Sequence, residues 1–378
     1  MSLDDWLAGQ AADREAQGLT RRLRPREAAR PGTDAPIDLA GNDYLGLATD
    51  PRIADAAATA VRTWGAGATG SRLVSGTTRL HAELEEALAD FCRQPAALVF
   101  SSGYLANLGV VTALAGPGTL LVSDAHVHAS LVDACRLARS RVEIVPHNDV
   151  DAVERALAGR EEPRALVLAE SVYSVLGDAA PLDRLAQVCA ERDAVLLVDE
   201  AHGVGVTGAG RGSVAAAGLA GAEHVVVTVT LSKALGAQGG AVLGSARLQQ
   251  HLVNRARTFI FDTGLAPAAT AAALAAVDVV RAEPDRVVAV HTVADRLARA
   301  AGVLPVPGAV LSVPVPGPRE AVAAAKTCAA HGVRVGAFRP PSVPDGVSRL
   351  RITARATLAG DALDRACEVL EHAVESVR

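Results

Sequence analysis

Lysine is almost absent from this chain of 378 residues, which has two, Lys233 and Lys326, against 35 arginines. A guanidinium stays protonated at any accessible pH, whereas a desolvated lysine amine can lose its proton and become a nucleophile. A lysine kept in a sequence that uses arginine almost everywhere else indicates a position where an amine is needed.

Other scarce features narrow the class of protein. Aromatic residues make up 3% of the chain, so the core must be built mainly from Ala, Val and Leu. The five cysteines are odd in number and widely spaced, which excludes a disulfide framework and is typical of a reduced, cytoplasmic protein. No apolar run is long enough to cross a bilayer, and the N-terminal segment is unlike a signal peptide. A net charge of −5 without a basic patch argues against nucleic acid as a partner.

Short apolar runs alternate with helical segments along most of the chain. The runs lie at 96–100, 119–122, 142–145, 165–169, 194–198, 225–229 and 241–243. Such alternation predicts an α/β fold with a mainly parallel sheet that helices cover on both faces. Further helices are expected over 3–24 and 361–377.

The length predicts one large domain and a smaller one. Five prolines between 305 and 318 mark a change of composition towards the C-terminus. The predicted organisation is an N-terminal helix and segment over 1–45, a large domain over 46–285 and a small domain over 286–378. The first of these is expected to pack with the small domain.

Lys233 follows the apolar, β-branched run 225–229, with Gly236 just beyond it. The end of a buried strand is a suitable place for a lysine that forms a Schiff base. The alternative is a surface lysine left by chance.

A second segment, SSGYLAN at 101–107, comes directly after the apolar run 96–100. A strand, a glycine turn and the start of a helix leave backbone N–H groups free to bind a phosphate. The alternative is an ordinary strand-to-helix turn. The segment lacks both the dinucleotide fingerprint and the Walker A pattern, so a nucleotide cofactor is not indicated.

Asp199 and His202 follow the apolar run 194–198. A carboxylate at the end of a buried strand needs a cation, and a protonated pyridine nitrogen would serve. His202 could reach the same ligand. The alternative is a helix-capping aspartate and a solvent-facing histidine.

Asp124, His126 and His128 lie close together in the sequence and raise the alternative of a metal-dependent hydrolase. That interpretation leaves Lys233 and the phosphate turn unexplained. Near the C-terminus, Arg349 and Arg351 alternate and could point towards a carboxylate ligand, or could lie on a solvated edge strand. A phosphate cradle, a carboxylate for a ring nitrogen and an amine for an aldehyde together predict pyridoxal phosphate (PLP).

These motifs resemble those of the α-oxoamine synthases, a family of fold-type-I PLP enzymes. The resemblance runs over nearly the whole chain. It is carried by NDYLGL (42–47), SSGYLAN (101–107), HASL (128–131), PHNDV (146–150), VDEAHG (198–203), TLSK (230–233) and RPPSVP (339–344). It implies a large PLP-binding domain with a mainly parallel sheet, a smaller α+β domain formed by the chain termini, and a homodimer.

The resemblance also implies a role for each matching residue. Lys233 would hold the cofactor covalently and move the substrate proton, Asp199 would pair with the pyridinium nitrogen, and His128 would stack on the ring. Further cofactor contacts are implied for Gly103, Tyr104, Ser174, His202, Thr230 and Thr263, the last towards the cofactor of the partner subunit. Substrate contacts are implied for Arg21, Asn42, His128, Arg339, Ser342 and Arg351.

Within the family, the segments PHNDV and RPPSVP favour the branch that leads to biotin. This branch condenses L-alanine with a pimeloyl thioester, carried by CoA or by acyl-carrier protein, and releases carbon dioxide. Ser232 and Ala234 look more like relatives that join glycine to acetyl-CoA or succinyl-CoA, such as 2-amino-3-ketobutyrate ligase. Phe261 stands where a tyrosine is often found. The glycine-using activity is therefore kept as the alternative.

Overall fold

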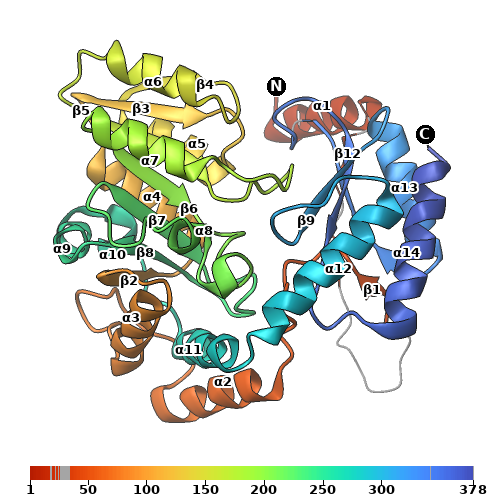
Figure 1. Cartoon of the computed structure of the whole chain (residues 1–378), viewed down its shortest axis with the longest axis horizontal. Coiled ribbons are helices and arrows are strands. Elements are labelled where there is room, and N and C mark those ends of the chain that lie inside the picture. The colour runs from red at the N-terminus through yellow and green to blue at the C-terminus, as the bar shows by residue number, and fades with distance from the viewer. Residues whose placement is uncertain (18, 22, 24, 26–34, 341, 378) are drawn as a thin grey trace.

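The computed structural model describes residues 1–17, 19–21, 23, 25, 35–340 and 342–377 (Figure 1). Its centre is a seven-stranded sheet with the order β2-β8-β7-β6-β5-β3-β4. Strand β8 runs antiparallel to both of its neighbours, and the other pairings are parallel. The strands are β2 (Ala96–Phe100), β3 (Thr119–Asp124), β4 (Arg141–Val145), β5 (Arg164–Glu170), β6 (Val195–Asp199), β7 (Val225–Thr230) and β8 (Gly240–Gly244).

Apart from the edge strand β4, which is largely exposed, the strands of the sheet are mostly apolar and buried on both faces. Successive residues of a strand point to opposite faces. Accordingly, Leu121 and Leu197 belong to one apolar cluster, whereas Leu120 and Leu196 belong to the other. The predicted mainly parallel α/β fold is confirmed.

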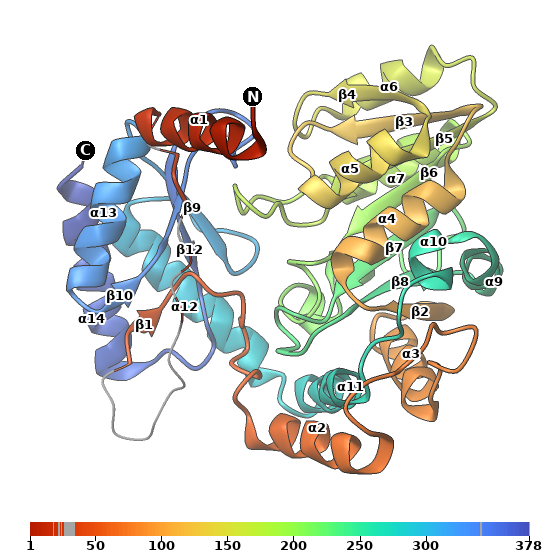
Figure 2. The same ribbon diagram turned by 180° about the vertical axis from the view of Figure 1, so that it is seen from behind.

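Helices cover both faces of this sheet (Figures 1 and 2). On one side α4 (Gly103–Leu114) packs against α5 (Ala129–Ala138), with α9 (Ala246–Arg255) and α10 (Arg257–Ile260) beside α4. On the other side lie α6 (Val150–Ala158) and α7 (Leu182–Glu191), and the short α8 (Ser213–Ala216) follows η1 (Gly208–Gly210). Helix α11 (Pro267–Ala282) packs against α2 (Pro51–Trp64) and α3 (Arg79–Phe91).

A second block lies beside the large sheet and is built mostly from the C-terminal part of the chain (Figure 2). Strands β9 (Val310–Pro314), β11 (Gly336–Phe338) and β12 (Arg349–Thr353) form an antiparallel sheet of order β11-β12-β9. Helices α12 (Asp285–Ala301), α13 (Pro318–Ala330) and α14 (Gly360–Glu375) pack with it. Helix α14 lies where the sequence predicts a C-terminal helix.

The N-terminal segment pairs with this block. Strand β1 (Ile37–Asp38) runs parallel to β10 (Val333–Arg334), and the Thr353 N–H donates to the Leu39 carbonyl over 2.8 Å. This pairing is in keeping with the predicted division of the chain, whose boundaries at 45 and 285 stay a prediction.

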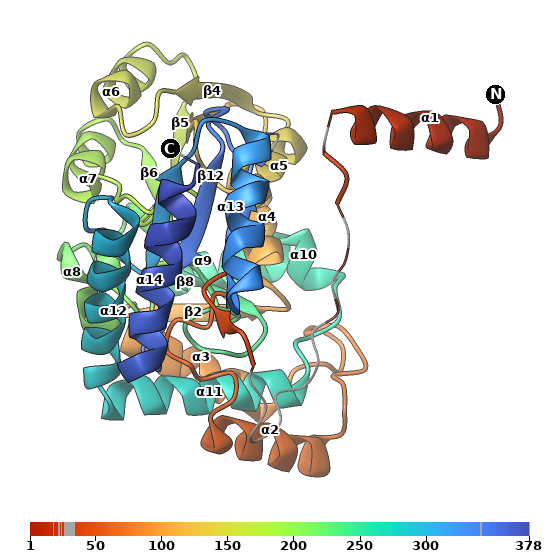
Figure 3. The same cartoon turned by 90° about the vertical axis from the view of Figure 1, so that its right-hand side faces the viewer.

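Helix α1 (Leu3–Ala16) is shorter than predicted. The Leu19 N–H donates to the Arg14 carbonyl over 2.8 Å and so closes the end of the helix, and residues 18, 22 and 24 lie outside the described residues. None of the helix's residues is buried, and Figure 3 shows α1 standing away from the rest of the chain.

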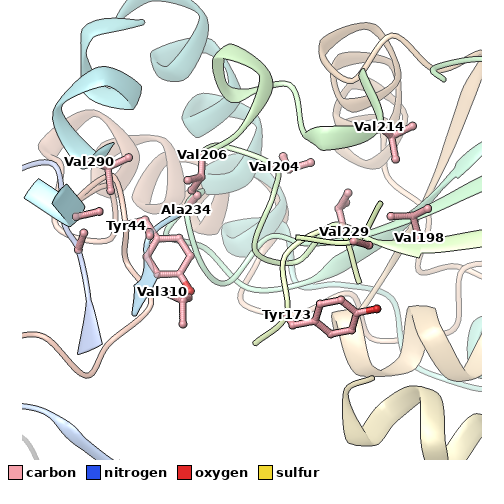
Figure 4. Close-up of a cluster of buried hydrophobic side chains, with 14 of the residues drawn as sticks. Tyr44, Tyr173, Val198, Val204, Val206, Val214, Val229, Ala234, Val290 and Val310 are labelled. Carbon is pink, nitrogen blue, oxygen red and sulfur yellow. The ribbon is translucent and has the colours of Figure 1, made fainter. Parts of the chain in front are cut away.

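Buried apolar side chains join the two blocks next to Lys233 (Figure 4). Tyr44, Val310 and Ala234 come from the segment after β1, from β9 and from the turn after β7, and all three are buried. Gly236 closes that turn at φ +61°, and a Cβ there would lie 2.4 Å from the Ala48 nitrogen. The turn that carries Lys233 is thus packed tightly between the two blocks.

Candidate active site

A cavity of about 260 Å³ opens at the C-terminal ends of β5, β6 and β7 and at the start of α4, the edge where α/β sheets bind ligands. It gathers eight of the residues predicted for the site. These are Gly103, Tyr104, His128, Ser174, Asp199, His202, Thr230 and Lys233. It is also lined by Ser102, Asn107, Ser130, Glu170, Ala201, Thr228, Val229 and Ser232.

The amine of Lys233 lies 3.0 Å from His202 Nε2. Burial lowers the pKa of Lys233 to about 8, against the pull of Asp199 and Glu170 and with help from the positive charge of Arg351. A lowered pKa means that more of the neutral, nucleophilic amine is present near neutral pH than in an ordinary lysine.

Asp199 ends β6 and is 5% exposed. Its Oδ2 accepts a hydrogen bond of 2.7 Å from Asn107 Nδ2, and its Oδ1 accepts one of 2.9 Å from the Ala201 N–H. No helix begins at Asp199, so the helix-capping alternative is wrong: the carboxylate accepts from the turn that follows β6 and lines the cavity, where a cationic ring nitrogen could meet it.

His202 is buried, so the alternative of a solvent-facing histidine is wrong. Its Nδ1 lies 2.7 Å from the Tyr44 hydroxyl, which in turn donates to Asn42 Oδ1 over 3.0 Å. Burial and the charge of Lys233 hold the pKa of His202 well below its usual value. A neutral ring with its hydrogen on Nδ1 donates to Tyr44 and leaves Nε2 to accept from the Lys233 ammonium group.

His128 precedes α5 as its capping residue and accepts a hydrogen bond of 3.2 Å from the Ser130 N–H at Nδ1. Asn107 Nδ2 donates to Ser130 Oγ over 2.9 Å as well as to Asp199. Burial lowers the pKa of His128. The ring is therefore held in place, mainly as the neutral form, over the cavity that Asp199 also lines.

The predicted phosphate turn lies at the start of α4. The Ser102 hydroxyl accepts from the Leu105 N–H over 3.2 Å, and the residues at the positive end of the helix, Ser102, Gly103 and Tyr104, line the cavity. A Cβ on Gly103 would lie 3.0 Å from Thr230 Cβ, a tight contact, so glycine lets the chain pass close to β7 here. Tyr104 stands at the rim, 41% exposed, with its hydroxyl donating to Asp133 Oδ2 over 2.5 Å.

Arg351 and Asn42 join the site from the second block. Arg351 Nε donates to the Ser174 carbonyl over 2.7 Å, and Nη1 and Nη2 donate to Asn42 Oδ1 over 3.2 and 3.1 Å. Arg349 instead makes a two-pronged ion pair with Asp345. Of the two alternating arginines, Arg351 is therefore the one that reaches the site.

Arg21, Arg339 and Ser342 line a second cavity of about 630 Å³, which shares no lining residue with the first. Arg21 Nη2 donates to Ser342 Oγ over 2.7 Å, and Arg14 adds another cation to the lining. The three predicted substrate residues thus lie together, but apart from the residues around Lys233.

Thr263 lines neither of these cavities. It forms an isolated antiparallel bridge with Ser71, in the glycine-dense segment 65–76. Its contact with the cofactor of a partner subunit stays a prediction.

The geometry does not favour the metal alternative. The ring of His126 stacks on His147 with centroids 4.2 Å apart, whereas His128 bonds Ser130. Across the described ranges, no group of three or more His, Cys, Asp or Glu side chains is placed to hold a metal ion.

Sequence reasoning missed Glu170, Ser130 and Tyr44 as members of the site. Glu170 is the last residue of β5, just as Asp199 is the last residue of β6, so the rule that singled out Asp199 applies to it as well. Ser130 lies two residues from His128 and contacts it directly, whereas Tyr44 reaches the site only through its tertiary contact with His202.

Comparison with known proteins places the chain. A family model described as aminotransferase class I and II matches residues 34–370. The chain belongs to this family.

Two relatives that are similar over almost their whole length are both named 8-amino-7-oxononanoate synthase. The 8-amino-7-oxononanoate synthase of Mycolicibacterium gilvum (strain PYR-GCK) is 58% identical over 367 residues, which cover 97% of this chain and 96% of that protein. The protein of the same name from Mycobacterium avium (strain 104) is 58% identical over 366 residues, covering 97% and 95%.

Solved structures agree on the fold. A serine palmitoyltransferase of Sphingomonas wittichii superposes with a TM-score of 0.91 at 29% identity, covering 100% of both chains. An SPT structure that contains PLP gives a TM-score of 0.90 at 29% identity, covering 100% of this chain and 99% of that one. An 8-amino-7-oxononanoate synthase from Francisella tularensis, 23% identical, covers 91% of this chain and 99% of its own with a TM-score of 0.77. These findings confirm the family resemblance drawn from the sequence.

One further observation concerns membranes. Within the ranges that the structure describes, helices long and apolar enough to cross a bilayer are absent.

Proposed function

We propose that this chain is a PLP-dependent acyltransferase that condenses L-alanine with a pimeloyl thioester. The proposed products are 8-amino-7-oxononanoate, the compound in the name of the relatives, together with carbon dioxide and the free thiol of the carrier. The observation that carries the proposal is a low-pKa lysine amine in the same cavity as a buried carboxylate and a helix N-terminus.

The residues of the cavity fit PLP. The start of α4 and Thr230 suit its phosphate, and Asp199 suits its ring nitrogen. Asn107 Oδ1 and Thr228 Oγ1 are buried without a hydrogen-bond partner although both residues line the cavity, which is what a site built around a polar ligand would show. When bound, PLP supplies an electron sink that weakens the bond between Cα and its hydrogen in an amino acid.

Four side chains of the cavity have different proposed roles toward this cofactor. The Lys233 amine would hold the cofactor, and the free amine would be placed to take the Cα proton of the amino acid, because its lowered pKa keeps part of it unprotonated. Asp199 offers the negative charge that keeps the ring nitrogen protonated. His128 and His202, both mainly neutral, confine the ring without adding positive charge near it.

Arg351 is the best-placed cation for the carboxylate of alanine. In the free chain its guanidinium is held by Asn42 and by the Ser174 carbonyl, so it is already oriented when the substrate arrives. A pimeloyl chain carries a second carboxyl group at its far end. The cavity with Arg21 and Arg339 supplies cations for that end, whereas an acetyl donor would leave them without a partner.

The proposed assembly is a homodimer. Val74 and Phe261 are 84% and 69% exposed and flank the Ser71–Thr263 bridge, and α1 has no buried residue in the single chain. A second copy that covers these surfaces would bring Thr263 near the partner's cofactor.

A product assay that crosses two amino acids with three acyl donors tests the activity. We expect the highest kcat/KM for alanine with a pimeloyl donor, and pimeloyl-CoA compared with pimeloyl-acyl-carrier protein identifies the carrier. A preference for glycine with acetyl-CoA would overturn the assignment in favour of the alternative that Ser232 and Ala234 suggest.

A further inference from the structure

Two buried carboxyl groups stand side by side at the base of the active-site cavity. Glu170 ends β5, Asp199 ends β6, and the two residues are register partners in the parallel pairing of these strands. Glu170 is 2% exposed and Asp199 is 5% exposed. A buried carboxylate on the strand next to Asp199 is costly to ionise, because burial and the charge of Asp199 both favour the protonated form of Glu170.

The hydrogen bonds differ between the two groups. Both oxygens of Asp199 accept hydrogen bonds, from the Asn107 side-chain amide and from the Ala201 backbone N–H. Glu170 accepts at Oε2 from the Ser174 N–H over 2.9 Å, while its Oε1 is buried without a partner. A buried bare carboxylate oxygen is costly, whereas the same atom carrying a hydrogen can donate into the cavity that Glu170 lines.

Burial and the charge of Asp199 point the same way. They raise the pKa of Glu170 to about 8, although Lys233 and the backbone N–H groups of Ser174 and His128 oppose them. The neutral acid therefore predominates at pH 7 and is lost as the pH rises through that value.

We propose that Glu170 is a neutral carboxylic acid in the resting enzyme and a positioning residue of the active site. It leaves Asp199 as the single carboxylate beneath the ring of the cofactor, and it anchors the turn at Ser174 that orients Arg351. This inference rests on the proposed function for its second part, and on the chain's own geometry for its first.

The anchoring runs through a short chain of contacts. The Ser174 N–H is held by Glu170, and the Ser174 carbonyl accepts from Arg351 Nε over 2.7 Å. The neutrality of Glu170 also matters for Lys233, because a negative charge at Glu170 raises the pKa of the lysine and would reduce its free amine. A neutral Glu170 can accept from the Ser174 N–H without raising the pKa of Lys233.

Infrared spectroscopy of the resting holoenzyme tests the charge directly. We expect a carbonyl stretching band of a protonated carboxyl group at pH about 6 that is missing in Glu170→Gln and fades in the wild type as the pH rises through about 8. Glu371→Gln, at an exposed glutamate, is the control and should leave the band unchanged. Identical spectra of the wild type and Glu170→Gln at that pH would overturn the proposal.

Two substitutions test the positioning role. Glu170→Gln keeps an uncharged acceptor for the Ser174 N–H, whereas Glu170→Ala removes it. We expect the KM for alanine to rise at least about tenfold more in Glu170→Ala than in Glu170→Gln. Equal losses in the two variants would contradict a neutral acceptor. The infrared band needs no substrate, so a chain that shows the band but makes no product would sink the proposed function and leave the charge state of Glu170 standing.

Discussion

At the scale of single residues, a chain of hydrogen bonds starts at the amine of Lys233. Lys233 lies beside His202, which reaches Tyr44, Asn42 and finally Arg351 through successive hydrogen bonds. The lysine is thus linked to the residue proposed to bind the substrate carboxylate, and each group in between is oriented by its neighbours.

Lys233→Arg should abolish covalent binding of the cofactor. Arginine keeps the positive charge but cannot present a neutral amine, so we expect the visible absorbance of the bound cofactor to disappear and activity to fall at least about a thousandfold. Lys326→Arg, the only other lysine substitution that the sequence offers, is the matched control and should behave as the wild type. Borohydride reduction followed by peptide mapping that placed the cofactor on Lys326 would contradict the assignment.

Asp199→Asn should fold but lose much of its ability to labilise the Cα hydrogen. The amide cannot supply the negative charge that keeps the ring nitrogen protonated, so exchange of the α-hydrogen of alanine for deuterium should slow at least tenfold, or about 1.4 kcal/mol. Exchange at the wild-type rate in this variant would show that Asp199 does not have this role.

At the scale of elements, His147 ties together three chain segments below the site. Its Nδ1 lies 2.9 Å from Asp124 Oδ1, at the end of β3, and its Nε2 lies 2.8 Å from Asp178 Oδ2. Burial alone would lower the pKa of His147, but the two hydrogen-bonded carboxylates outweigh it and raise the pKa to about 9. Both ring nitrogens therefore donate at neutral pH, as a charged clamp.

This clamp predicts a pH-dependent contribution to stability. The pKa is higher in the folded chain than the ordinary value of 6.5, so the contribution is complete below about pH 6.5 and is lost as the pH rises through about 9. We expect His147→Gln to lower the free energy of unfolding by roughly 1–3 kcal/mol near pH 6, and by much less near pH 10.

Urea unfolding of the two proteins at both pH values measures the difference. His372→Gln, at an exposed histidine, serves as the control. A loss in His147→Gln that is the same at both pH values would show that packing, and not charge, explains the effect.

The sequence predicts the strands of the large sheet well because each is a short apolar run with turn residues at its ends. All seven runs became strands within a residue or two of the expected limits. The predicted N-terminal helix was too long. Its charged and apolar residues are interleaved as in a helix, but none of them is buried, so no packing stabilises further helical turns. Helix periodicity without a packed face is a weak predictor of helix length.

The candidate site was predictable wherever a chemically suitable residue ends a strand, as Asp199 does, or comes shortly after one, as Lys233 does. The contact of Arg351 with Asn42 was not, because these residues are 309 positions apart and no local pattern encodes their meeting. The relation of Glu170 to Asp199 depends on the register of two parallel strands, which the sequence of either strand alone does not specify.

At the scale of the whole molecule, the exposed apolar side chains of Val74 and Phe261 lie next to the bridge between Ser71 and Thr263. The buried ion pair of Arg72 with Glu85, 3.0 Å long, holds the segment 65–76 in place next to Ser71. An exposed apolar tip on a rigid base is more typical of an interface than of a mobile loop. Because Thr263 lies outside the cavity of its own chain, a second copy is the natural place for its predicted cofactor contact.

Val74→Glu therefore tests the homodimer. Val74 is 84% exposed in the single chain, so a charge there should leave the monomer's stability within about 0.5 kcal/mol, but it should be poorly tolerated in a dry interface. We expect sedimentation to show a dimer dissociation constant at least about tenfold higher, and cofactor retention and activity to fall with the dimer fraction. Leu304→Glu is the matched control, since Leu304 is also 84% exposed but lies in the C-terminal block after α12. A wild-type chain that sediments as a fully active monomer would rule out an active site shared between two subunits, and Val74 would then not lie in a dimer interface.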